Sequence, residues 1–166
     1  SRVMDNNVQL KGLNDNKSLL QNIDNLILLG CGTSYNACEY AIYFFKKLCR
    51  FKSVSYIDAA EFSLIDIPKT GKTAAILCSQ SGETRDLYKC IIIAKDYNIF
   101  TIGIVNVVDS LISRNVNCGC YLNVGREVAV ASTKSFTGMC ILLILVALWF
   151  SNNFNDNYNS VENNTI

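Results

Sequence analysis

One stretch constrains the fold more than any other: an apolar strand that turns into a helix through small hydroxyl residues. Residues 73–78 are apolar and β-branched in type, the letters SQSGET follow at 79–84, and a helical pattern begins near Arg85. The first N–H groups of a helix lack intrahelical partners, and the helix dipole adds positive potential there. We therefore interpret 79–84 as the phosphate cradle of a sugar-phosphate site. An ordinary capped turn is the alternative.

Strand-like and helix-like segments alternate along the whole chain. This alternation predicts βαβ units with right-handed crossovers, and hence an α/β fold: a three-layer αβα sandwich around a five-stranded parallel, flavodoxin-like sheet. Ligands of such sheets bind beyond the carboxyl ends of the strands. The turns at 30–34, 79–84 and 124–132 are therefore expected to meet at one edge. The expected strands are 26–29, 54–57, 73–78, 100–105 and 119–123, and the expected helices are 35–48, a short one starting at Asp58, 85–97, 110–115, and one from Ser132 or Thr133 to about Phe150.

The 166 residues suffice for one domain with a real core. We divide the chain into a lead-in with a short helix (1–25), the ligand-binding domain (26–150) and an Asn-rich tail (151–166), in which no catalytic role is expected.

The net charge of +1, without a basic block, argues against nucleic acid or an anionic membrane as partner. The apolar run 139–150 is too short to span a bilayer and predicts a buried helix. A polar opening without a secretory signal favours the cytoplasm.

The composition excludes several chemistries within this chain. There is no histidine, which removes Ser-His-Asp and Cys-His systems and histidine-ligated metal. The eight cysteines lie mostly in apolar strand-like or helix-like segments, which predicts reduced core thiols rather than disulfides, with a metal or redox role as the alternative. The GxG at 30–32 lacks the third glycine of a dinucleotide fingerprint, and no ATP-cleaving P-loop sequence occurs. We therefore expect no metal and no cofactor.

Three segments, taken together and in this order, carry a family resemblance. LGCGTSYNA, CSQSGETRDL and EVAVASTKSF resemble the successive strand-to-helix turns of the first sugar isomerase (SIS) subdomain of the glutamine–fructose-6-phosphate aminotransferases. The resemblance spans roughly residues 5 to 150. The element ASTK points to this family of aminotransferase/isomerase enzymes rather than to simpler SIS proteins.

The resemblance implies a phosphosugar site. That family makes glucosamine 6-phosphate from fructose 6-phosphate and glutamine, on the way to UDP-N-acetylglucosamine. Lys134, Glu83 and Glu127 could be taken for a Schiff-base lysine and general bases, but we assign them structural or helix-start roles and expect no catalytic residue in this chain. The resemblance implies phosphate contacts from Ser34, Ser79, Gln80, Ser81 and Thr84, and sugar contacts from Thr33, Ser132 and, through its backbone, Val130.

The chain also departs from the family. Two partner domains of the family are missing from this sequence. They are the glutaminase domain and the second SIS subdomain, which carries the glutamate base, a histidine and a C-terminal lysine. We therefore expect a fragment that binds a sugar phosphate but cannot turn it over alone, and a parent protein that forms a homodimer. Two rival hypotheses remain: a non-catalytic SIS module of a regulator, and a nucleotide- or flavin-binding flavodoxin-like domain.

Overall fold

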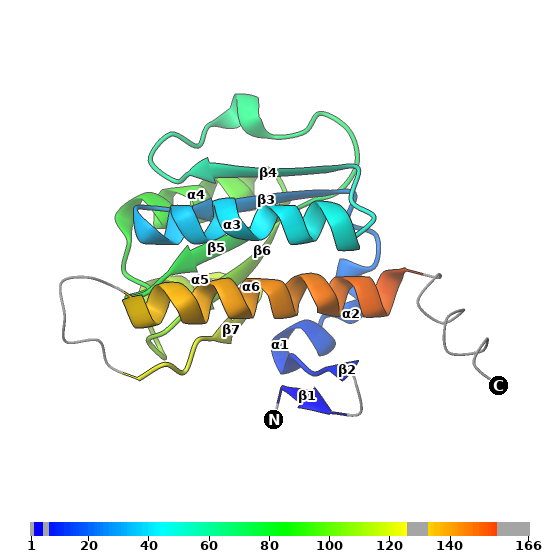
Figure 1. The fold of residues 1–166 in the computed structure, drawn as a ribbon. Coiled ribbons are helices and arrows are strands. Elements are labelled where there is room, and N and C mark those ends of the chain that lie inside the picture. Colours follow the sequence, from blue (N-terminus) through cyan, green and yellow to red (C-terminus); the bar gives the residue numbers. More distant parts are fainter. Residues whose placement is uncertain (1, 5–6, 126–132, 156–166) are drawn as a thin grey trace.

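A computed structural model describes residues 2–4, 7–125 and 133–155 of the chain. Its centre is a sheet of five parallel strands in the spatial order β4-β3-β5-β6-β7, shown in Figure 1. This order is the flavodoxin-like arrangement, so the predicted fold class is confirmed. The strands are β3 (Asn25–Gly30), β4 (Ser53–Asp58), β5 (Thr73–Ser79), β6 (Phe100–Val105) and β7 (Cys118–Tyr121).

Helices cover both faces of this sheet. Figure 1 shows α3 (Thr33–Leu48) and α6 (Thr133–Phe154) in front of it, while α4 (Arg85–Asp96) and α5 (Leu111–Asn115) pack on the other face. Alternate residues of a strand point to opposite faces. Leu28 accordingly joins the core under α3 and α6, whereas its neighbour Ile27 joins the core under α4. Because both of their faces are buried, the central strands β3, β5 and β6 are apolar at most positions, as is typical of parallel sheets, whereas the edge strands β4 and β7 are only partly buried.

The N-terminal segment packs against the edge of the sheet. A hairpin of β1 (Val3–Met4) and β2 (Asn7–Val8) is followed by two short helices, α1 (Lys11–Asn14) and α2 (Lys17–Leu20). Gly12 of α1 lies so close to β7 that a Cβ atom there would stand 2.3 Å from the Gly119 carbonyl oxygen. The Arg2 guanidinium donates to the Tyr121 carbonyl. From the sequence we expected one short helix here; the hairpin and α1 were not predicted.

The helix expected to start at Asp58 does not form. The Asp58 carboxylate accepts the Ala60 N–H at 2.9 Å and closes a turn. The chain then enters a 3-10 helix, η1 (Leu64–Asp66), which begins after Ser63. The Asp66 carboxylate accepts the Ser63 N–H at 2.9 Å. The chain therefore forms two separate short elements after β4, a turn at Asp58 and the 3-10 helix η1, in place of one continuous helix.

The last helix is longer than predicted. It continues to Phe154 and spans 22 residues, so by length and composition alone it could cross a membrane. However, 56% of its most apolar window is buried inside the protein, as expected of a core helix. The predicted end near Phe150 was therefore too early.

Candidate functional site

Two of the predicted loops lie side by side at the carboxyl edge of the sheet. β4 lies on one side of β3, and the next strand in sequence, β5, lies on the other side. The connections that leave β3 and β4 therefore run in opposite directions across the sheet, which makes the space between β3 and β5 its topological switch point. Leu29 and Leu77 are in register near the ends of these strands. The turns that follow, 30–34 and 79–84, therefore flank the switch point where ligands of such sheets bind. The third predicted loop begins after β7, but 126–132 lie outside the described residues.

Ser79 organises the SQSGET turn from the inside. It is 2% exposed, and its Oγ accepts the Gly82 N–H at 2.9 Å. The hydroxyls of Ser79 and Thr84 are 2.9 Å apart and share a hydrogen bond. At the surface of the turn, Ser81 Oγ accepts the Glu83 N–H at 3.2 Å. Ser79 therefore shapes the loop, while the half-buried Gln80, Ser81 and Thr84 can reach a ligand.

Two helix N-termini open onto this edge without a side-chain cap. Thr84 precedes α4, but its side chain bonds to Ser79 and not to the first amides of the helix. Gly32 precedes α3 and has no side chain to offer. Within the described chain, the leading N–H groups of both helices thus lack a side-chain acceptor, which suits an anion. Ser34 and Thr33 lie in the first turn of α3, the former buried and the latter exposed.

The segment after β6 holds the SQSGET turn in place. The Asn106 and Ile112 N–H groups donate to the Gln80 and Gly82 carbonyls at 3.3 and 2.9 Å. The Glu83 carboxylate accepts the Leu111 N–H at 2.9 Å, at the start of α5. Glu83 is therefore a helix-start residue, as expected, but it serves α5 rather than the helix that follows it in sequence.

Asn106 also reaches the segment after β7. Its Nδ2 donates to the Gly125 carbonyl at 2.8 Å, and its Oδ1 accepts the Val124 N–H at 3.2 Å. One side chain thus joins the end of β6 to the start of the third loop. We did not predict this role of Asn106 from the sequence, and no local signal could have revealed it.

The two remaining predicted sugar contacts, and the two residues that we assigned structural roles in place of catalytic ones, can be placed as follows. Val130 and Ser132, the predicted sugar contacts, and Glu127 all lie outside the described residues. Lys134 is described and stands exposed in the first turn of α6.

The cysteines do not supply an activated nucleophile. All eight fall within the described ranges, and each carries a free thiol. Burial raises the pKa of Cys49, Cys90 and Cys118 to about 12. Cys31 lies beside the site, and burial together with the Asp58 carboxylate raises the pKa of its thiol. Among the described residues, no cluster of three or more Cys, Asp or Glu side chains is placed to hold a metal ion.

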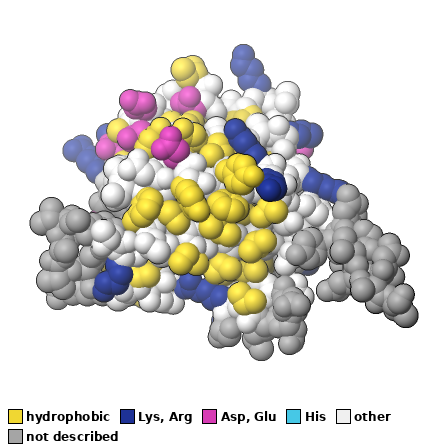
Figure 2. Space-filling model, in the orientation of Figure 1, with side chains coloured by type: hydrophobic (Ala, Val, Ile, Leu, Met, Phe, Trp, Pro, Cys, Tyr) yellow, Lys and Arg dark blue, Asp and Glu magenta, His cyan; other side chains and the backbone are white. Residues whose placement is uncertain are grey.

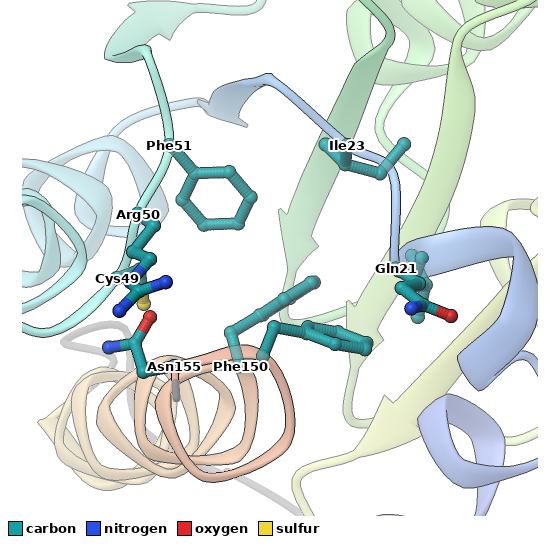
Figure 3. Close-up of a pocket in the computed structure, with 9 residues that line it drawn as sticks. Gln21, Ile23, Cys49, Arg50, Phe51, Phe150 and Asn155 are labelled. Atoms are coloured by element: carbon teal, nitrogen blue, oxygen red, sulfur yellow. The ribbon is translucent and has the colours of Figure 1, made fainter. Parts of the chain in front are cut away.

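A separate cavity lies at the other end of the strands, away from the loop site. Figure 3 shows Ile23, Phe51 and Phe150 facing a space of about 130 Å³. Ile23 and Phe51 precede β3 and β4, so this cavity is near the amino ends of those strands. It is thus distinct from the loop site.

Comparison with known proteins identifies the family to which this fold belongs. The SIS domain family matches residues 19–148. The chain is 48% identical over 126 residues to a probable glutamine–fructose-6-phosphate aminotransferase of Acanthamoeba polyphaga mimivirus, covering 76% of this chain and 21% of the relative. It is 36% identical to glutamine–fructose-6-phosphate aminotransferase 2 of Mus musculus, covering 88% and 21%.

A solved structure is also similar. The C-terminal domain of glucosamine-fructose-6-phosphate aminotransferase from Francisella tularensis superposes with a TM-score of 0.78 at 27% identity, covering 97% of this chain and 46% of that one. The chain thus spans about a fifth of the length of the curated relatives named above. With the family match covering most of its length and the switch-point loops in place, the chain belongs to the SIS domain family.

Proposed function

We propose that this chain is the phosphosugar-binding half of the isomerase domain of a glutamine–fructose-6-phosphate aminotransferase. The observation that carries the proposal is the pairing of two helix N-termini without side-chain caps with a hydroxyl-rich turn at the switch point. The names of the relatives support the choice of fructose 6-phosphate as substrate. Glucosamine 6-phosphate as product and UDP-N-acetylglucosamine as its later fate are part of the same proposal. A cytoplasmic location and a homodimeric parent protein belong to the same proposal.

The phosphate is held here by dipoles rather than by a field of basic side chains. The hydroxyls of Ser34, Ser81 and Thr84, with the Gln80 amide, complete the ring of donors around the helix N-termini. Ser79 keeps the turn in its shape, and it remains a proposed phosphate contact as well. Thr33, Val130 and Ser132 are the proposed sugar contacts. This half of the domain would contribute to catalysis by orienting the substrate through its phosphate.

Proton transfer between C1 and C2 of the sugar is assigned to groups outside this chain. We therefore expect the 166-residue chain, given fructose 6-phosphate and ammonia, to form no glucosamine 6-phosphate above background. Product detection by mass spectrometry checks this. Turnover by this chain would contradict the assignment.

Ser81→Ala should weaken binding of fructose 6-phosphate by about 10-fold or more, because a hydrogen bond to a charged ligand is worth about 1.5–3 kcal/mol. Ser81 is the best test residue, since the hydrogen bond that its hydroxyl accepts from the Glu83 N–H is local and long, at 3.2 Å. Calorimetric or thermal-shift titration of both proteins measures the effect. Ser18→Ala, on exposed α2, is the matched control and should bind as the wild type does. Equal affinities for all three would remove Ser81 from the site.

Asn106→Ala should weaken the binding of one ligand more than that of another. Inorganic phosphate touches only the phosphate loop, whereas fructose 6-phosphate also depends on the third loop, which Asn106 joins through Val124 and Gly125. We expect a loss of up to about 30-fold for the sugar phosphate, the limit set by two neutral hydrogen bonds of about 1 kcal/mol each, and little change for phosphate. Asn106→Asp keeps only the acceptor and should fall between. Equal losses for both ligands would show a merely structural role.

A non-catalytic regulatory SIS module is the second candidate. It has the same loops and needs the same phosphate grip, so ligand titration does not separate the two. The reading frame of the parent gene does: glutaminase and second SIS sequences favour the enzyme, and a DNA-binding helix-turn-helix favours the regulator.

A further inference from the structure

The cavity near the amino ends of β3 and β4 has aromatic and aliphatic walls. Five apolar side chains line it: Leu20, Ile23, Phe51, Phe150 and Phe154. They come from the end of α2, from the residues before β3 and β4, and from α6. Figure 3 shows Phe51 and Ile23 on one side of the space and Phe150 on the other. The cavity is therefore built by several elements of the fold.

The aromatic walls hold one another in position. The rings of Phe51 and Phe150 meet edge-on, with centroids 5.1 Å apart, and the rings of Phe150 and Phe154 are 5.9 Å apart. On the far side of Phe150, the indole ring of Trp149 packs edge-on at 5.2 Å. A ring that moved into the cavity would lose these contacts, so the space stays open.

A thiol completes the wall, and polar groups stand at the mouth. Cys49 lines the cavity, and its Sγ donates to the Ala147 carbonyl at 3.3 Å. Burial raises the pKa of this thiol to about 12, so it is uncharged at neutral pH. A neutral, polarizable sulfur is a favourable neighbour for an aromatic ring. Arg50 and Gln21 are exposed on opposite sides of the cavity in Figure 3, which places polar side chains where it meets water.

The volume limits what the cavity can hold. It is about 130 Å³. Apolar cavities of about 150 Å³ bind benzene, and they stay dry without a ligand. One aromatic ring with a small substituent therefore fits this space, whereas a sugar phosphate or a nucleotide is too large for it.

The cavity differs from the open apolar surface of the same two helices. Figure 2 shows hydrophobic side chains gathered over α3 and α6 in the view of Figure 1, with lysine and arginine toward the margins. That surface is open to any neighbour, so its shape selects none. The cavity is bounded by Leu20 and Phe150, which are 1% and 2% exposed, and its shape therefore selects by size.

We propose that this cavity is a binding site for a small, single-ring aromatic molecule, whose ring packs against Phe51 and Phe150 and whose polar substituent lies at the mouth. A flat ring can make the edge-to-face contacts that the phenylalanine rings already make with one another. The site is separate from the proposed phosphate site. α3 begins at the phosphate turn and ends beside the cavity, and its 16 residues span about 24 Å. The two ligands should therefore not compete.

The test is a titration of the 166-residue chain with phenol, followed by thermal melts and by the fluorescence of Trp149. Trp149 is the only tryptophan, and its ring contacts Phe150 and Phe154, so it reports on the cavity. Phenol should bind saturably, with a dissociation constant on the order of 1 mM, as a ligand of one ring can reach. Cyclohexanol has a similar size but no flat π face, and should bind about 2- to 10-fold more weakly.

Two variants fill the cavity from different walls. Ile23→Phe and Cys49→Met each add side-chain volume to the space, so each should remove the response to phenol while the melting temperature stays or rises. Two variants are used because one of them can fail to fold. Ile65→Phe is the matched control, since Ile65 is 92% exposed in η1 and does not line the cavity. It should bind phenol as the wild type does.

Three results would overturn the inference. A wild type without a saturable response would show that the cavity takes no aromatic ring. A response that persists in both folded filling variants would place the phenol elsewhere. Binding that appears only in Tyr158→Ala would assign the space to a side chain of the chain's own tail, since Tyr158 follows Asn155 by three positions. Titration with fructose 6-phosphate in the presence of phenol reports on the phosphate site independently.

Discussion

Replacing Trp149 with alanine should lower the free energy of unfolding by about 3–5 kcal/mol, the usual cost of deleting a large aromatic core residue. Trp149 is fully buried in α6. Its ring meets Phe150 and Phe154 edge-on, with centroids 5.2 and 5.5 Å away. Its indole N–H donates to Asn14 Oδ1 at 2.6 Å, which ties α6 to α1. The substitution therefore removes core volume and the link to the N-terminal segment together.

Urea unfolding followed by far-ultraviolet circular dichroism measures this loss, because the variant has no tryptophan left for fluorescence. Trp149→Phe keeps much of the ring and loses the hydrogen bond, so its cost should be clearly smaller. Ile65→Ala, at an exposed site, should change stability by no more than about 0.5 kcal/mol. If Trp149→Ala costs no more than Ile65→Ala, the core assigned to α6 is wrong.

Gly82→Ala should destabilise the protein by about 2–5 kcal/mol and abolish sugar-phosphate binding. Gly82 has a φ of +70°, where an ordinary residue loses roughly 1–2 kcal/mol. A Cβ atom there would also stand 2.0 Å from Ser110 Oγ and 2.4 Å from Ser110 Cβ, and such overpacking typically costs about 1–3 kcal/mol. Relief of the clash would move the SQSGET turn away from Ser110, and with it the donors for the phosphate.

Two variants separate the clash from the backbone cost. Gly125 has a φ of +75° and open space around its Cβ position, so Gly125→Ala should lose only the backbone part. Adding Ser110→Gly to Gly82→Ala should restore much of the stability, because it removes both clashing atoms. The Ser110 hydroxyl is buried and has no hydrogen-bond partner among the described residues, so its removal costs no hydrogen bond within them. Thermal melts and titration with fructose 6-phosphate provide the measurements. Equal losses for Gly82→Ala and Gly125→Ala would contradict the clash.

The sheet could be predicted from sequence because burial on both faces leaves a direct trace. Segments such as 73–78 and 100–105 are apolar at almost every position, and they form β5 and β6. The turn at 79–84 was equally accessible, because hydroxyl residues and a glycine separate the strand from the helix there. Its phosphate contacts stay predictions. β7 was the weakest prediction, and it occupies 118–121 rather than 119–123.

What could not be predicted depends on partners distant in sequence. Glu83 precedes α4, but its carboxylate binds an amide of α5, 28 positions away. Asn106 bonds to Gly125 only because β5, β6 and β7 are neighbours in space. Asp58 could equally cap a helix or close a turn, and the contacts after Ser63 decide between them. The sugar contacts of Val130 and Ser132 stay predictions.

The position of α1 has a practical consequence for expression of this domain. β7 is an edge strand with β6 as its neighbour in the sheet, and α1 lies against its backbone. The family match begins only at residue 19, after this helix. A gene trimmed to the family limits would encode a protein whose outer strand is open to pairing with other chains, which is a common route to aggregation. Recombinant versions should therefore retain the residues before 19 as a built-in guard against insolubility.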